Sequence, residues 1–126
     1  MNDSKYNIRV NAQSTYLEEQ SEPTANRYAF AYTITIANTG TVAAQLLSRH
    51  WLITDANGRV QEVHGDGVVG QQPLIEPGKA FQYTSGAVLE TPLGSMSGSY
   101  QMKASDGEQF TAAIPIFRLA VPRVLN

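Results

Sequence analysis

The sequence predicts an all-β protein, an antiparallel β-sandwich of about seven or eight strands. Large apolar side chains recur at every second position along most of the chain, which is the period of a strand with one buried face. Ten glycines and six prolines interrupt the chain too often for a helix of normal length. Short strands with this punctuation are typical of immunoglobulin-like and fibronectin type III-like sandwiches. We expect one such domain over residues 1–126.

The first two strands have the clearest alternation. Apolar and polar residues alternate over 8–16, which predicts the first strand. A polar loop follows at 18–26. The next segment, "YAFAYTITIAN" (28–38), carries large apolar side chains at its even positions and small ones at its odd positions. It is the strongest strand pattern in the chain, and the turn residues Asn-Thr-Gly end it.

A hairpin is predicted in the middle of the chain. "LLSRHWLIT" (46–54) is rich in β-branched and aromatic residues, and "RVQEV" (59–63) follows after the turn residues "DANG". Trp51 lies in the first of these strands, where such sandwiches often bury a tryptophan. Because side chains alternate along a strand, Val60 and Glu62 share one face of the return strand.

The remaining strands follow from the same two signals. Pro77-Gly78 predicts a turn, and apolar residues at odd positions over 81–89 predict the strand after it. Two further strands, at 100–104 and 110–114, are joined by Asp106-Gly107, which predicts a two-residue hairpin turn.

Composition and charge exclude several classes of function. The net charge is −2 and the nine basic residues are scattered, so the basic patch of a nucleic-acid-binding protein is missing. No apolar run reaches the roughly 20 residues that span a bilayer, so we expect no membrane insertion. The first residues lack the apolar core of a signal peptide, and the chain has no cysteine. We expect a cytoplasmic protein that needs no cofactor.

A glycine-rich loop is the first candidate site. "HGDGVVGQQP" has the glycine spacing of a dinucleotide-binding fingerprint, but two prolines follow where the fingerprint needs a helix, which excludes that fold. We expect the glycines to serve conformation, at least one at positive φ, with the two valines in a short apolar contact. The alternative is a backbone nest that binds a small anion or a nucleotide phosphate. The candidate anion-binding or partner-facing loop consists of Gly65, Asp66, Gly67, Val68, Val69 and Gly70.

Metal binding and catalysis have less support in the sequence. The candidate metal ligands are His50 and His64, which a carboxylate could join in space. The two histidines lie on different strands without the local spacing of a metal motif, so we expect no ordered metal site. Glu62 and His64 share a strand face. No serine or threonine lies in a nucleophile motif, and no pair of acids has the spacing of an acid and a base. We therefore expect no enzyme and no catalytic residues.

The end of the chain carries an apolar segment that leaves two interpretations open. It is either a last edge strand that covers the core, or an apolar patch that pairs with a partner or a second copy of the chain. A homodimer through an edge strand or through this tail is one expected assembly. The apolar residues are Leu119, Val121, Val124 and Leu125.

Three long, ordered motifs lie within residues 48–100: "HWxITDANG", "GxGVVGxQPxIxPGxxFxYxSG" and "TPxGxMxGxY". On these motifs the segment closely resembles the bacterial ApaG family, and "YNIRV" and "AAIPIFRL" extend the resemblance to most of the chain. Two positions depart from the common pattern. Ser48 stands where a second basic residue often precedes Arg49, and Gln71 stands where a glutamate often follows Gly70.

The resemblance implies an immunoglobulin-like or fibronectin-like sandwich, and it implies no catalytic residues. It also implies an association with cobalt and magnesium efflux, which would be indirect in a chain without a membrane span. Similar domains in eukaryotic F-box proteins and in a DNA-polymerase-interacting protein imply protein binding. We therefore expect a non-enzymatic, adaptor-like protein-interaction domain whose protein partner is unknown.

Overall fold

Eight β-strands make up most of residues 4–122, the part of the chain that the computed structural model describes. Three short 3₁₀ turns accompany the strands, and this part of the chain holds no α-helix, so the all-β prediction is confirmed. The 3₁₀ turns are η1 (Ser4–Tyr6), η2 (Glu18–Gln20) and η3 (Pro23–Ala25). The strands are β1 (Ile8–Tyr16), β2 (Tyr28–Asn38), β3 (Ala44–Asp55), β4 (Val60–Asp66), β5 (Leu74–Ile75), β6 (Ala80–Leu89), β7 (Leu93–Ala104) and β8 (Gln109–Ala120).

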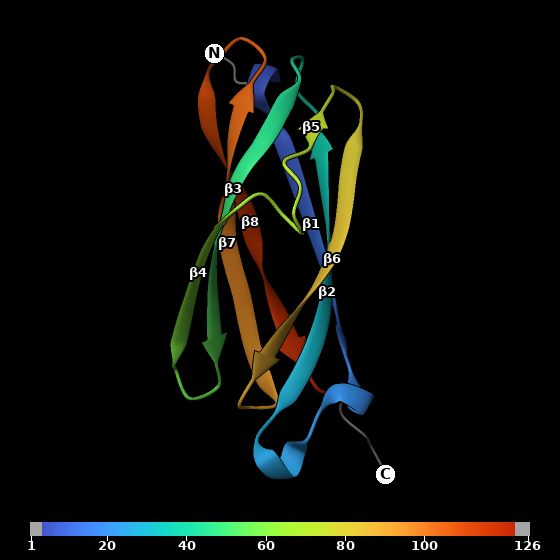
Figure 1. Cartoon of the computed structure of the whole chain (residues 1–126), viewed down its shortest axis with the longest axis vertical. Coiled ribbons are helices and arrows are strands. Elements are labelled where there is room, and N and C mark those ends of the chain that lie inside the picture. The colour runs from blue at the N-terminus through green and yellow to red at the C-terminus, as the bar shows by residue number, and fades with distance from the viewer. Residues whose placement is uncertain (1–3, 123–126) are drawn as a thin grey trace.

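The strands form two antiparallel sheets that pack face to face (Figure 1). One sheet has the order β1-β2-β6, and the other has the order β4-β3-β7-β8, with the short β5 paired to β3. The predicted sandwich is therefore confirmed.

Side chains from the inner faces of both sheets form the core. The large even-numbered residues of β2 point inward, as their alternation predicts, and Ile34 and Ile36 are fully buried. Trp51 is only 2% exposed, and its indole ring meets three aromatic rings edge-on at centroid distances of 5.4–6.4 Å. In immunoglobulin domains the buried tryptophan packs against a disulfide. This chain has no disulfide, and Trp51 packs against aromatic rings instead.

The two long sides of the sandwich differ. On one side β1 runs beside β8, and the Ser14 hydroxyl donates a hydrogen bond to the carbonyl of Arg118, 2.7 Å away. On the other side the edge strands β4 and β6 pair with no further strand among residues 4–122. The sandwich is therefore closed along β1 and β8 and open along β4 and β6.

Two details differ from the sequence-based expectations. The turn at Asp106-Gly107 is one residue longer than the predicted two-residue turn: the Gly107 N–H donates to Ala104, and Gly107 has φ +92°. Strand β7 begins at Leu93, and the segment before residue 100 escaped prediction because its glycines and serines have low strand propensity.

The end of the chain is described only in part. Leu119 is fully buried in β8, as expected of a strand that covers the core, while Val124 and Leu125 lie outside the described residues. No helix within residues 4–122 is long and apolar enough to cross a membrane.

Candidate functional site

The glycine-rich loop is a tight reversal between β4 and β5. The main chains of Val68 and Gln71 exchange two hydrogen bonds of 2.8 and 2.9 Å, so Val69 and Gly70 are the central residues of a two-residue turn. Both have positive φ, +43° and +79°, as in a type I′ turn. No helix follows, and β5 pairs with β3 instead. A dinucleotide-binding fold is therefore absent from the described residues.

Gly67 and Gly70 have positive φ, which confirms the expectation for at least one of the three glycines. Gly67 has φ +63°, and a methyl group there would lie 2.3 Å from the carbonyl oxygen of Gln71. Val68 is fully buried in the core, but Val69 is 53% exposed, so only one of the two valines makes the expected apolar contact. The turn points Val69 away from the sandwich.

Several N–H groups in this loop and next to it already donate within the fold. The N–H of Gly67 donates to the carbonyl of Leu47, and those of Val68 and Gln71 donate to each other's carbonyls. A backbone nest needs several free N–H groups that point at one anion. Phosphate binding at this loop stays a prediction, and these contacts give it no support.

Gly65 has a different role from the other two glycines. It lies in β4 opposite Arg49, whose guanidinium group occupies the space that a side chain at Gly65 would fill. The guanidinium donates to the carbonyl oxygens of Asp66 and Gly67 at 3.0 and 2.8 Å. Arg49 therefore fixes the end of β4 to β3, and Gly65 makes room for it.

The two histidines face each other on the outer surface of the second sheet. His50 of β3 lies directly opposite His64 of β4, and their rings stack at a centroid distance of 4.3 Å. Both Nε2 atoms approach the Oε2 atom of Glu62, at 2.6 Å from His50 and 3.0 Å from His64. A carboxylate only accepts hydrogen bonds, so each Nε2 carries the proton that it donates.

Glu62 responds electrostatically to these two donors. The hydrogen bond from His50, followed by the one from His64, lowers the pKa of the Glu62 carboxyl below its ordinary value of 4.5. The three side chains are partly exposed, so water screens their charges.

The strand period placed Glu62 and His64 on one face, but no local spacing in the sequence joined them to His50. The signal lay in the turn. The N–H of Asp55 donates to the carbonyl of Arg59, and counting back along both strands from this pair places His50 opposite His64. A turn one residue shorter or longer would have changed the pairing and separated the rings.

A groove of about 430 Å³ opens between the unpaired edges of β4 and β6. Its lining combines aromatic core residues with small and polar residues of the two edges. The main lining residues are Phe30, Trp51, Gln61, Val63, Ser85 and Ala87. The Nε1 atom of Trp51 is buried and has no acceptor within residues 4–122. No single stretch of sequence signals this groove, because four strands contribute to it.

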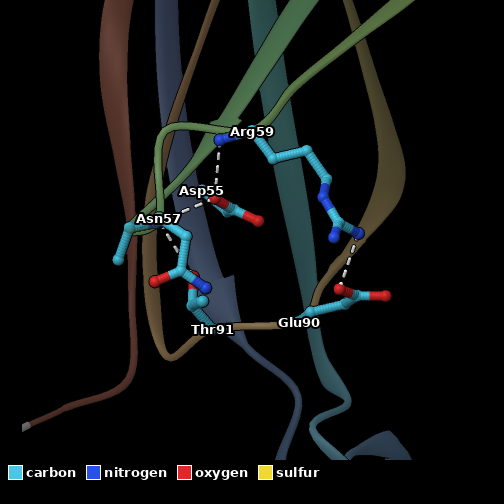
Figure 2. A network of polar contacts seen from close by, with 6 residues as sticks. Asp55, Asn57, Arg59, Glu90 and Thr91 are labelled. Atoms are coloured by element: carbon cyan, nitrogen blue, oxygen red, sulfur yellow. Dashed lines mark hydrogen bonds and ion pairs between the residues drawn. The ribbon is translucent and has the colours of Figure 1, made fainter.

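An ion pair joins the two edges at one end of the groove (Figure 2). Arg59, just before β4, contacts Glu90, just after β6, at 2.8 Å. The turn that carries Arg59 is held by Asp55, whose Oδ1 accepts from the N–H groups of Asn57 and Arg59. The Thr91 hydroxyl also accepts from the N–H of Ala56, so the β3–β4 turn is bound to the β6–β7 connection.

Comparison with known proteins supplies relatives along the whole chain. Residues 18–104 match the family model described as the ApaG domain. The chain is 64% identical to Protein ApaG of Azoarcus sp. (strain BH72), over 96% of this chain and 95% of that protein. It is 62% identical to Protein ApaG of Pseudomonas paraeruginosa over the full length of both. A Bordetella pertussis protein, whose crystal structure carries the provisional name ApaA, superposes with a TM-score of 0.92 at 51% identity, covering 94% of this chain and 97% of that one.

Proposed function

We propose that the chain, which belongs to the ApaG family, acts as a non-enzymatic protein-interaction domain. In this proposal an extended segment of a partner protein binds between strands β4 and β6. The observation that carries the proposal is the pair of unpaired strand edges on either side of one groove. An extended segment can add to such an edge through main-chain hydrogen bonds, while its alternate side chains fill the space between the sheets.

The surface of the groove supports this kind of ligand. Phe30 and Trp51 offer apolar contact, and Gln61 and Ser85 at the edges offer hydrogen bonds. An adaptor-like role fits a binding surface made of main-chain edges, because such surfaces recognise segments rather than small substrates.

The non-enzymatic part of the proposal rests on how the polar side chains are used. The chain has two histidines, and the Nε2 atom of each one contacts Glu62. Among the described hydrogen bonds, neither histidine contacts a serine or threonine hydroxyl. A nucleophilic mechanism would need such a pair. In this proposal, any link to cobalt and magnesium efflux acts through the bound partner.

Two tryptophan substitutions on neighbouring residues of β4 test the proposal. Gln61→Trp places a large side chain in the groove, and Val60→Trp places the same side chain on the opposite face of the strand. The wild-type chain and both variants are cross-linked in a cell lysate, captured, and compared by mass spectrometry. We expect a partner that wild type and Val60→Trp retain and that Gln61→Trp loses.

The single tryptophan provides a second readout. A peptide from the captured partner should shift the indole N–H resonance of Trp51 in the wild-type chain, because the Trp51 side chain lines the groove. Capture of the same proteins by all three chains, or an indole resonance that stays fixed, would contradict the proposal. Capture of a second copy of this chain would show that the partner is the chain itself and that the assembly is a homodimer.

A further inference from the structure

We propose that His50, Glu62 and His64 form a binding site for a divalent transition-metal ion of the Zn²⁺ class. This inference departs from the sequence-based expectation that no ordered metal site exists. It does not depend on the protein-interaction proposal, because the cluster lies on the outer face of the hairpin and the groove opens along its inner face.

The backbone already brings the three ligand residues together. His50 and His64 form a directly opposed cross-strand pair, and Glu62 lies two residues from His64 on the same face of β4. A paired hairpin of this kind holds its side chains at fixed spacing, and its register is specified by the turn at 55–59. The ligand positions therefore exist before a metal arrives, which reduces the entropy lost on binding.

The side chains converge as a metal site requires. One potential ligand atom from each residue lies within 4.8 Å of the other two. A tetrahedral zinc ion with bonds of about 2.0–2.1 Å separates its ligand atoms by about 3.3 Å. The nitrogen-to-oxygen distance of 3.0 Å from His64 must lengthen by about 0.3 Å, and that of 2.6 Å from His50 by about 0.7 Å. The stacked rings must also splay so that both nitrogens point at one ion.

The side chains are free to make this adjustment. Their exposed fractions are 34% for His50, 54% for Glu62 and 68% for His64, so no core residue opposes a change of rotamer. Each imidazole moves its proton from Nε2 to Nδ1, which frees the Nε2 lone pair for the metal. The hydrogen bonds to Glu62 are then replaced by bonds to the ion.

The donor set indicates the class of ion. Two imidazoles with one carboxylate suit Zn²⁺, Ni²⁺ and Cu²⁺, whereas Mg²⁺ and Ca²⁺ prefer sites made of oxygen ligands. A hollow of about 470 Å³ lies beside the two histidines, lined in part by Ser48 and Asp66. It leaves room for water or a small ligand at the remaining coordination positions.

Zinc titration of the full chain without an affinity tag tests the site. Calorimetry measures stoichiometry and affinity, and the ring-proton NMR signals of the two histidines report where the ion binds. We expect one Zn²⁺ per chain and shifts of both sets of signals. Each of His50→Ala, His64→Ala and Glu62→Gln should weaken binding at least about tenfold, as the loss of a metal ligand does.

The matched control is Glu76→Gln, which neutralises an exposed carboxylate in the loop after β5 and should leave the affinity unchanged. All four residues are partly or fully exposed, so unchanged melting temperatures would verify that every variant folds. Histidine signals that stay fixed at millimolar Zn²⁺ would overturn the proposal. Equal binding by Glu62→Gln and wild type would also overturn it, because it would reduce the site to two exposed histidines.

Discussion

The hydroxyl groups of Tyr83 and Tyr100 hydrogen-bond to each other across the interior of the sandwich, at 2.5 Å. Tyr83 belongs to β6 and Tyr100 to β7, so this bond joins the two sheets. Burial raises the pKa of Tyr83 to about 12, and burial also raises the pKa of Tyr100 above its ordinary value. Both hydroxyls therefore stay neutral, and one donates its proton to the other in the core.

Removing one of these hydroxyls should destabilise the fold more than removing both. Tyr83→Phe or Tyr100→Phe leaves a buried hydroxyl without a partner, which costs about 1–3 kcal/mol. The double variant leaves no unpaired hydroxyl, so its cost should be smaller than that of either single variant, and therefore smaller than the sum of the two. Urea unfolding of the four chains measures this coupling. Additive costs would mean that the two hydroxyls do not depend on each other.

The glycines of the loop should differ in their tolerance of alanine. Gly70→Ala should cost about 1–2 kcal/mol, because its positive φ strains any residue with a Cβ, although the space around it is open. Gly67→Ala should cost more, because the added methyl also meets the Gln71 carbonyl at 2.3 Å. Thermal melts rank the two. The control is Gly86→Ala, where a Cβ makes only ordinary contact at 3.4 Å. An equal loss in all three variants would contradict this explanation.

Replacing Val69 should stabilise the protein. Val69 is β-branched, and it adopts φ +43° at the first central position of the two-residue turn. Val69→Asn would place Asn-Gly at the centre of that turn, the preferred sequence for type I′ geometry. Since Val69 is 53% exposed, the change removes little apolar burial. We expect a gain of about 1 kcal/mol in the free energy of unfolding. A lower melting temperature would show that the valine makes a contact worth more than the strain.

Asn38 should be among the polar residues that the fold tolerates losing least. It is 2% exposed, and its side-chain amide donates to the carbonyls of Val42 and Ile75, both at 2.8 Å. Asn38→Ala leaves these carbonyls without that donor and should cost at least about 1–3 kcal/mol. The neighbouring Thr39→Ala removes one exposed hydrogen bond and should cost less. Equal costs in urea unfolding would show that water replaces the buried amide.

Acid should weaken the contact between η1 and the β7–β8 turn. The Tyr6 hydroxyl donates to Asp106 at 2.6 Å, and this bond, with the Glu108 N–H and Lys5, lowers the Asp106 pKa from 3.8 to about 2. Because the pKa is lower in the folded chain, this stabilisation is present above about pH 4 and is lost as the pH falls toward 2.

Carboxyl NMR titration of Asp106 checks the direction of this shift. Tyr6→Phe removes the largest cause and should raise the Asp106 pKa toward its ordinary value. Asp106→Asn should remove this part of the acid sensitivity of the fold. A pKa that stays near 2 in Tyr6→Phe would assign the shift to Lys5 and the Glu108 N–H instead.

Much of the fold was predictable because strand structure has a local signature. The alternation over 28–38 identified β2 and its buried face, since neighbouring side chains on a strand point to opposite sides. Positive φ at Gly67 and Gly70 was also predictable, because glycine is the residue that adopts it without strain. Val69 at positive φ was not, since a valine there contradicts its own local preference.

The candidate sites depended on tertiary structure. That Glu62 and His64 share a strand face could be read from their spacing alone, because side chains two residues apart on a strand point to the same side. Only the folded hairpin decided that His50 lies opposite His64, and only the packing of two sheets produced the groove and the Tyr83–Tyr100 bond. The physical reason is that side-chain alternation is set within each strand, whereas contacts between strands depend on turn length, register and the way the sheets pack.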